Sequence, residues 1–165
     1  IRDSLTGLYN HSYFQKWLEL AIGSLREKDD VISLVMGDLD YFKRINDSHG
    51  HQAGDVVLKN ICHLLNNLPT SDYICARYGG DEFAMVFKGK DANQTFSIME
   101  DIRQRISQKV FEIDNESVQI TVSAGIVEAR FSGTKKIHKA DLIASADQLL
   151  YRAKAEGRNR VIIAR

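Results

Sequence analysis

The sequence predicts an α/β fold in which a mixed β-sheet carries helices on its faces. Apolar residues alternate along the chain between helical spacing and short β-branched runs. Two short strand patterns are joined by a tight Gly-Gly turn, which indicates an antiparallel hairpin. The other strand patterns are separated by helical segments, and such crossovers place helices against the sheet. With 165 residues, 44% of them hydrophobic, the chain is long enough to form one domain with a buried core.

The first half of the chain begins with a helix. Apolar residues three and four positions apart predict an amphipathic helix over residues 10–27. Residues 31–37 read VISLVMG, and this almost continuous apolar run predicts a strand buried on both faces. A short helix or turn is expected over residues 40–47. A longer helix is expected over residues 53–68, because Pro69 ends the helical pattern there.

The second half continues the alternation. Strands are expected over residues 73–78, 82–88, 117–129 and 160–164. A third long helix follows Asp91, which is a suitable N-cap residue. The last helix is expected to end at Gly157, since glycine commonly follows a helix C-terminus.

Composition excludes several classes of function. The 22 Lys and Arg residues balance the 22 Asp and Glu residues, so the formal net charge is zero. A neutral domain is poorly suited to coating nucleic acid or an anionic membrane. No apolar run approaches the ~20 residues of a membrane span, and no signal peptide opens the chain. We therefore expect no nucleic-acid partner, no membrane insertion by this domain and a cytoplasmic location.

The cysteines and the first residue bear on the surroundings of the domain. Cys62 and Cys75 belong to no CxxC pair, and we expect buried thiols in a reducing compartment. The sequence does not decide whether these two cysteines form a disulfide, because that depends on the distance and orientation of their side chains. The chain begins at Ile1 rather than Met, so we expect it to be a piece of a longer protein.

Carboxylates follow the first strand and the Gly-Gly turn. Asp38 and Asp40 lie where the buried strand ends, and a carboxylate there is costly unless it is solvated, paired or bound to a metal. Gly79-Gly80 permits positive φ and close approach of a bulky ligand, and Asp81 follows. A solvated strand end and an ordinary turn are the alternative. If the hairpin pairs beside the first strand, Asp38 and Asp81 converge, and hard oxygen ligands suit Mg²⁺.

Two further clusters suit a nucleotide. Asn46 and Asp55 flank a short loop, and they are either turn and helix caps or readers of a base. Guanine offers an N–H pair to a carboxylate, and adenine lacks that pair. Lys154 and Arg158, next to Gly157, are either favourable charges at a helix C-terminus or ligands of terminal phosphates.

Six segments resemble, in order, the motifs of GGDEF domains, the diguanylate cyclases. They are residues 3–10, 37–43, 45–55, 77–83, 121–126 and 146–159. The resemblance implies a nucleotidyl-cyclase or polymerase-palm fold with a largely antiparallel central sheet. It also implies condensation of two GTP molecules to cyclic dimeric GMP and two pyrophosphates. Each protomer of a transient homodimer would supply one GTP half-site. An N-terminal sensor or regulatory domain would precede residues 1–165 in a longer signalling protein, whether or not that protein is anchored in a membrane.

The resemblance also implies roles at the reacting centre. Mg²⁺ or Mn²⁺ would be held by Asp38, Asp81 and the carbonyl of Leu39. Glu82 would assist at the metal or in deprotonation. Guanine would be read by Asn46 and Asp55. The triphosphate would be held by the backbone at Phe42 and Lys43 and by the side chains of Lys154 and Arg158.

The inhibitory motif of many family members, Arg-x-x-Asp before the signature, is missing. Its arginine position is Thr70 and its aspartate position is Tyr73. A one-residue shift would supply Asp72 but would put Pro69 in the arginine position. We therefore expect no such inhibitory site.

Two alternatives to a cyclase remain. One is a catalytically inactive module that binds GTP or a dinucleotide, and the other is a dimerisation partner for a neighbouring domain. The unbroken signature over residues 79–83, with Asp38 in place, favours the enzyme.

Overall fold

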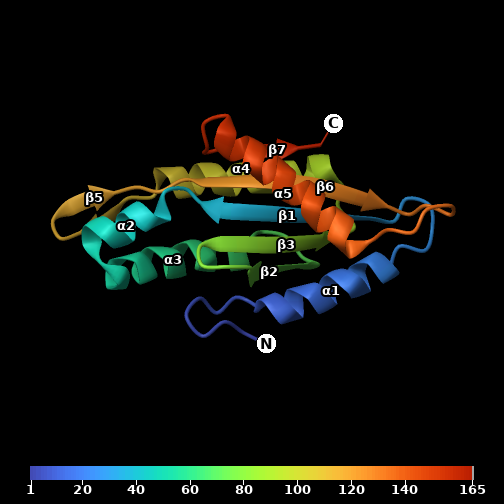
Figure 1. Ribbon diagram of the computed structural model, residues 1–165, viewed down its shortest axis with the longest axis horizontal. Helices are drawn as coiled ribbons and strands as arrows, with labels where there is room; N and C mark the ends of the chain where they lie inside the picture. Colours follow the sequence, from blue (N-terminus) through green and yellow to red (C-terminus); the bar gives the residue numbers. More distant parts are fainter. Residues whose placement is uncertain (165) are drawn as a thin grey trace.

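The computed structural model describes residues 1–164 and centres on a five-stranded sheet (Figure 1). The sheet strands are β1 (Val31–Leu39), β2 (Tyr73–Arg77), β3 (Glu82–Lys88), β6 (Val122–Arg130) and β7 (Val161–Ile163). Their order is β2-β3-β1-β6-β7, and all neighbours are antiparallel except β6 and β7. A mixed, largely antiparallel sheet is therefore confirmed, with the predicted hairpin β2–β3 beside β1.

Helices cover both faces of this sheet (Figure 1). They are α1 (His11–Gly23), α2 (Phe42–His49), α3 (His51–Asn66), α4 (Ala92–Gln108) and α5 (Lys139–Ala155). One hydrophobic cluster joins α1 and α5 to the sheet, and a second joins α2, α3 and α4 to the other face. Among the described residues, none of the helices combines the length and the apolar character that crossing a membrane requires.

Strand β1 is buried along its whole length, as the apolar run predicts. Leu34 and Met36 pack in the cluster with α1 and α5, whereas Val35 and Leu39 pack in the cluster with α3 and α4. The strand extends two residues beyond the predicted end at residue 37. Because side chains alternate between faces, Asp38 lies on the α5 side of the sheet.

The expected long strand over residues 117–129 is wrong. The segment divides into β5 (Glu116–Val118) and β6, and β5 forms a separate hairpin with β4 (Phe111–Ile113). Asp114 and Asn115 make the turn in the left-handed region, with φ of 50° and 66°. Three-residue strands with mixed polarity give little periodic signal, so only the Asp-Asn pair marked this hairpin.

Helix boundaries differ from the prediction by a few residues. α1 ends at Gly23 rather than residue 27, because the Ser24 N–H and hydroxyl both bond to the carbonyl oxygen of Ala21 and close the last turn. α3 begins at His51, two residues early, directly after Gly50 with a φ of 90°. Asp91 caps α4 as predicted, since its side chain accepts the Gln94 N–H at 2.8 Å.

Both cysteines are buried and unpaired, as expected. Burial raises the pKa of the Cys62 thiol to about 12, and burial also raises the pKa of Cys75 well above its ordinary value. Neither thiol is therefore reactive near neutral pH.

The contact of α5 with β6 requires a glycine. A Cβ on Gly125 would lie 2.5 Å from the Leu150 nitrogen and 2.6 Å from the Ala146 oxygen, both helix backbone atoms. We expect Gly125→Ala to lower the free energy of unfolding by about 1–3 kcal/mol, because a helix backbone cannot move aside as a side chain can. Gly23→Ala is the control, since nothing lies within 4 Å of its added Cβ. Urea unfolding of both variants checks this, and equal losses would contradict it.

Candidate functional site

Asp38 is a buried carboxylate that the protein leaves half satisfied. Its residue is 8% exposed, and its Oδ1 atom has no hydrogen-bond partner among the described residues. Its Oδ2 atom accepts from the Lys154 ammonium group, which reaches down from α5. Burial raises the pKa of Asp38 to about 7, against the hydrogen bond from Lys154 and with the help of the nearby charge of Asp81. An orphaned anionic oxygen beside a second carboxylate fits a divalent cation.

The β2–β3 turn brings Asp81 to Asp38. The Leu39 N–H donates to the Asp81 carbonyl oxygen at 3.2 Å, and Asp38 pairs in register with Glu82. The predicted convergence of Asp38 and Asp81 is therefore observed. The carbonyl of Leu39 lies at the same strand end.

The double glycine does not provide the positive φ that the sequence analysis expected, and its role here is to leave space. Neither Gly79 nor Gly80 has a positive φ. A Cβ on Gly79 would lie 2.8 Å from the Glu82 Oε1 atom, whereas a Cβ on Gly80 would meet nothing within 4 Å. Gly79 thus admits the Glu82 carboxylate, and Gly80 leaves an open approach to the turn.

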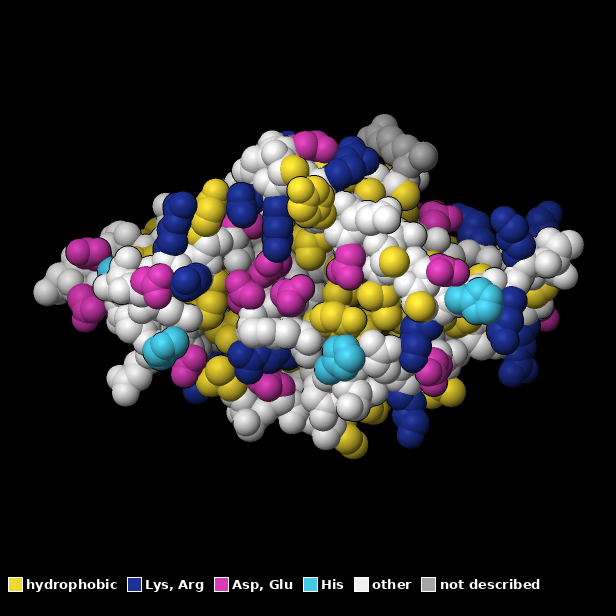
Figure 2. Space-filling model, viewed as in Figure 1, with side chains coloured by type: hydrophobic (Ala, Val, Ile, Leu, Met, Phe, Trp, Pro, Cys, Tyr) yellow, Lys and Arg dark blue, Asp and Glu magenta, His cyan; other side chains and the backbone are white. Residues whose placement is uncertain are grey.

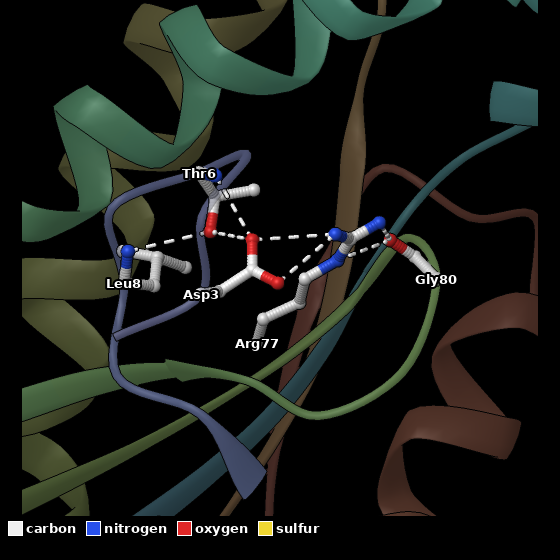
Figure 3. Close-up of polar contacts among 5 residues, drawn as sticks. All are labelled: Asp3, Thr6, Leu8, Arg77 and Gly80. Carbon is white, nitrogen blue, oxygen red and sulfur yellow. Dashed lines mark hydrogen bonds and ion pairs between the residues drawn. The ribbon is translucent and has the colours of Figure 1, made fainter. Parts of the chain in front are cut away.

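Arg77 holds this turn from the side, and the sequence did not reveal it (Figure 3). Its Nε and Nη2 groups donate to the Gly80 carbonyl oxygen at 3.0 and 2.9 Å. Its Nη1 group donates to both carboxylate oxygens of Asp3, at 3.2 and 3.3 Å. Against the effect of burial, hydrogen bonds from Thr6 and the charge of Arg77 lower the pKa of Asp3. The N-terminal segment therefore fixes the signature turn.

Asp40 has a structural role, unlike Asp38. Its Oδ1 atom accepts from the Ser123 hydroxyl at 2.7 Å. Its Oδ2 atom accepts from the Thr121 hydroxyl at 2.7 Å and from the Asn159 N–H at 3.0 Å. Both oxygens are satisfied, so the metal hypothesis for the Asp-x-Asp motif applies to Asp38 alone. Asp40 instead anchors the turn after α5 that carries Arg158.

A cavity of about 290 Å³ opens beside the signature turn. It is lined by Phe42, Lys43, Asn46, His51, Asp55, Leu58, Arg77, Gly80 and Asp81. The Asn46 Oδ1 atom is buried and has no hydrogen-bond partner within residues 1–164. It packs so closely that a Cβ on Gly54 would lie 1.7 Å from it. The structure thus brings Asn46 and Asp55 into one cavity.

The alternative interpretation of Asn46 and Asp55 as caps is not supported. α3 follows Gly50 at its N-cap position, and no side chain of the described residues caps the start of α2 or α3. His51 and Leu58 also line the cavity. His51 lies within the segment 45–55 that resembles the family, but the sequence had given neither residue a role. Both lie on the same face of α3 as Asp55, four residues before it and three residues after it.

The expected phosphate ligands come from two elements that meet near Asp38. Phe42 and Lys43 begin α2, and the first N–H groups of a helix have no partner within it. Arg158 donates to the Tyr41 hydroxyl at 3.3 Å, and Lys154 is bound to Asp38. Figure 2 shows acidic side chains gathered at the middle of this face, with basic ones beside them between α2 and the end of α5.

Tyr73, which stands where the inhibitory motif has an aspartate, has a structural role. The Tyr73 hydroxyl accepts the Leu68 N–H and donates to the Leu65 carbonyl oxygen, each at 2.9 Å. Tyr73 thereby closes the end of α3. Neither it nor Thr70 offers a guanidinium or a carboxylate.

Comparison with known proteins gives matches over nearly the whole chain. Residues 1–160 match the family described as "Diguanylate cyclase, GGDEF domain". Diguanylate cyclase A of Treponema denticola is 32% identical over 167 residues, which cover 99% of this chain and 44% of that protein. Diguanylate cyclase DgcP of Pseudomonas aeruginosa is 37% identical over 165 residues, which cover 99% of this chain and 24% of DgcP. The chain spans less than half the length of these curated relatives.

Solved structures give the same answer for the fold. The GGDEF domain of DgcB from Caulobacter crescentus, in complex with c-di-GMP, has a TM-score of 0.90 and 34% identity, covering 98% of this chain and 94% of that one. The active GGEEF domain of a diguanylate cyclase from Vibrio cholerae has a TM-score of 0.84 and 32% identity, covering 96% and 98%. The expected palm-like cyclase fold is confirmed.

The raised pKa of Asp38 predicts that its charge destabilises the metal-free protein. Between about pH 4 and pH 7, the folded state keeps a proton on Asp38 that the unfolded state has already lost. The free energy of unfolding therefore falls as pH rises through this window. We expect Asp38→Asn, relative to the native chain, to gain stability at pH 8 compared with pH 5. Urea unfolding with a chelator present measures this. Asp40→Asn is the control and should be destabilised at both pH values, because it sets an amide against hydrogen-bond donors. A relative loss by Asp38→Asn on going from pH 5 to pH 8 would refute the prediction.

Proposed function

We propose that this chain, which belongs to the GGDEF domain family of diguanylate cyclases, condenses two GTP molecules into cyclic dimeric GMP and two pyrophosphates. One observation carries the proposal. Two buried oxygens, Asp38 Oδ1 and Asn46 Oδ1, have no hydrogen-bond partner in the described part of the chain and lie at the same end of the sheet. The first suits a cation and the second suits an N–H group of a base, so together they fit a metal-bound nucleotide.

The cation would be Mg²⁺ or Mn²⁺, held by Asp38, Asp81 and the Leu39 carbonyl. When bound, it lowers the pKa of the attacking hydroxyl and screens the phosphates. The unpartnered oxygen of Asp38 and its neighbour Asp81 support this assignment.

The cavity beside the β2–β3 turn would select the base. The Asp55 carboxylate accepts from the N1–H and the amino group of guanine, and Asn46 contacts the same edge. Adenine offers no such pair of donors. The shared cavity of Asn46 and Asp55 supports these roles.

The triphosphate chain then lies along the start of α2. The N–H groups at Phe42 and Lys43 donate to its oxygens, and Lys154 and Arg158 pair with the terminal phosphates. In this proposal Lys154 exchanges Asp38 for phosphate when the nucleotide binds. The ion pair of Asp38 and Lys154 in the free chain supports this exchange, because the pair keeps the ammonium group at the site.

The reaction is an in-line displacement at the α-phosphorus. The 3′-oxygen of one GTP forms a bond to the α-phosphorus of the other, the bond to pyrophosphate breaks, and the hydroxyl proton leaves. The reciprocal displacement, by the 3′-oxygen of the second nucleotide on the α-phosphorus of the first, closes the ring and releases the second pyrophosphate and proton. Glu82 assists either at the cation or by accepting this proton. Each chain offers one site, so two chains face each other with two-fold symmetry, and specific activity rises with protein concentration.

The surrounding protein is part of the proposal. We propose that residues 1–165 are one GGDEF domain of a longer signalling protein and work in the cytoplasm, whether or not the parent is anchored in a membrane. The chain's coverage of only 44% of Diguanylate cyclase A and 45% of the membrane protein SERP0413 of Staphylococcus epidermidis supports this.

We also propose that the product inhibits the reaction little, because the Arg-x-x-Asp motif is missing.

Turnover is the direct test. Incubation with GTP and Mg²⁺ should yield cyclic dimeric GMP and pyrophosphate, resolved by chromatography. Asp38→Ala and Asp81→Ala should each abolish turnover while circular dichroism stays unchanged, since both carboxylates are assigned to the cation rather than to the core. Asp101→Ala, on the exposed side of α4, is the matched control and should keep full activity. Binding of GTP without product would support an inactive module instead.

Base discrimination tests the cavity separately. Asp55→Asn keeps the shape but turns an acceptor into a donor, so one donor of guanine is left unpaired at a cost of ~1–3 kcal/mol. The preference for GTP over ATP should fall by roughly five- to a hundredfold. Calorimetry with both nucleotides measures the ratio, and an unchanged ratio would remove Asp55 from base reading.

A further inference from the structure

Two guanidinium groups lie over the ring of Tyr41, the residue that precedes α2. The Arg44 Cζ atom is 3.9 Å from the ring centre, and the Arg158 Cζ atom is 4.5 Å from it. Arg158 also donates to the Tyr41 hydroxyl at 3.3 Å. Arg44 belongs to α2, whereas Arg158 follows α5, so the ring gathers two cations from segments far apart in sequence.

Neither of these two cations has an acidic partner in the described part of the chain. Among residues 1–164, ten ion pairs form within 4.0 Å, and none of them includes Arg44 or Arg158. Both Cζ atoms lie within 4.5 Å of one ring centre, so the charges are less than about 9 Å apart. That distance is close to the Debye length of ~8 Å in physiological salt, and their repulsion is only partly screened. An anion bound between or beside the two arginines would reduce this repulsion.

Tyr41 is held as a fixed platform for these groups. Its φ of 57° lies in the left-handed region, which an aromatic residue seldom adopts. The residue before it, Asp40, is fully hydrogen-bonded, and the Arg44 N–H donates to the Tyr41 carbonyl oxygen at 2.9 Å. The ring therefore stays beside the strand end while the two arginines pack on it.

The platform adjoins the start of α2. Tyr41 comes directly before Phe42 and Lys43, whose N–H groups are the proposed phosphate donors. Lys154, on the other side, is bound to Asp38. Figure 2 shows basic side chains close to acidic ones on this face, between α2 and the end of α5. The unpaired charge thus lies where the terminal phosphates of a nucleotide would extend.

We propose that Arg44 is a further phosphate-binding residue and that Tyr41 is the positioning residue that aims Arg44 and Arg158 at one ligand. The ligand class is the pyrophosphate portion of a nucleoside triphosphate, because two planar guanidinium forks match two adjacent phosphates. The inference deepens the proposed function and rests on it for the identity of the nucleotide. It makes the site selective for triphosphates over monophosphates.

Calorimetry with pyrophosphate and with GMP, each at fixed Mg²⁺, tests the inference. Arg44→Gln should weaken pyrophosphate binding by about five- to tenfold, since one exposed charge-assisted contact is lost. GMP, which lacks the terminal phosphates, should bind unchanged. Tyr41→Ala should behave like Arg44→Gln, whereas Tyr41→Phe keeps the ring and should retain most of the affinity.

Arg152→Gln is the matched control, because the Arg152 guanidinium on α5 already pairs with Glu156 at 3.2 Å. It should leave both affinities unchanged. Unchanged pyrophosphate affinity in Arg44→Gln, or equal losses for pyrophosphate and GMP, would overturn the inference. Failure of the proposed function looks different: the native chain would make no cyclic dimeric GMP, while the dependence of pyrophosphate binding on Arg44 would persist.

Discussion

A carboxylate buried at the end of the central strand is the constraint on which the site depends. Asp38 lies between β3 and β6, where little of it is exposed, and among the described residues only the Lys154 ammonium group donates to one of its oxygens. A charge placed there costs stability unless another cation joins it. The fold accepts this cost at a single position, and the arrangement of Asp81, Lys154 and the start of α2 follows from it.

The residues around this carboxylate divide into those that face a ligand and those that hold them. Asp3 and Arg77 hold the signature turn by its Gly80 carbonyl. Asp40 holds the turn that carries Arg158. These supports are themselves charged or polar, and each makes several hydrogen bonds that hold it in place. Polar motif residues thus serve two purposes that their sequence spacing alone does not separate.

The sequence predicted most of the sheet for a simple reason: β1 and the β2–β3 hairpin are apolar runs with a strong turn between them. It could not assign different roles to Asp38 and Asp40, because both lie at the end of the same strand and their hydrogen-bond partners are more than 80 positions away. The sequence predicted both backbone freedom and ligand approach for Gly79-Gly80; the backbone freedom is not used, and the close contact with Glu82 is what requires glycine at position 79. Hairpin β4–β5 was missed because its strands have only three residues each.

A crystal structure with 3′-deoxy-GTP and Mn²⁺ tests the central claim most directly, since the analogue cannot react and manganese is located by its anomalous scattering. The expected result is manganese bound by Asp38 and Asp81, guanine against Asn46 and Asp55, and Lys154 moved from Asp38 to a phosphate. Manganese elsewhere, with Lys154 still paired to Asp38, would contradict the assignment of this buried carboxylate to a cation.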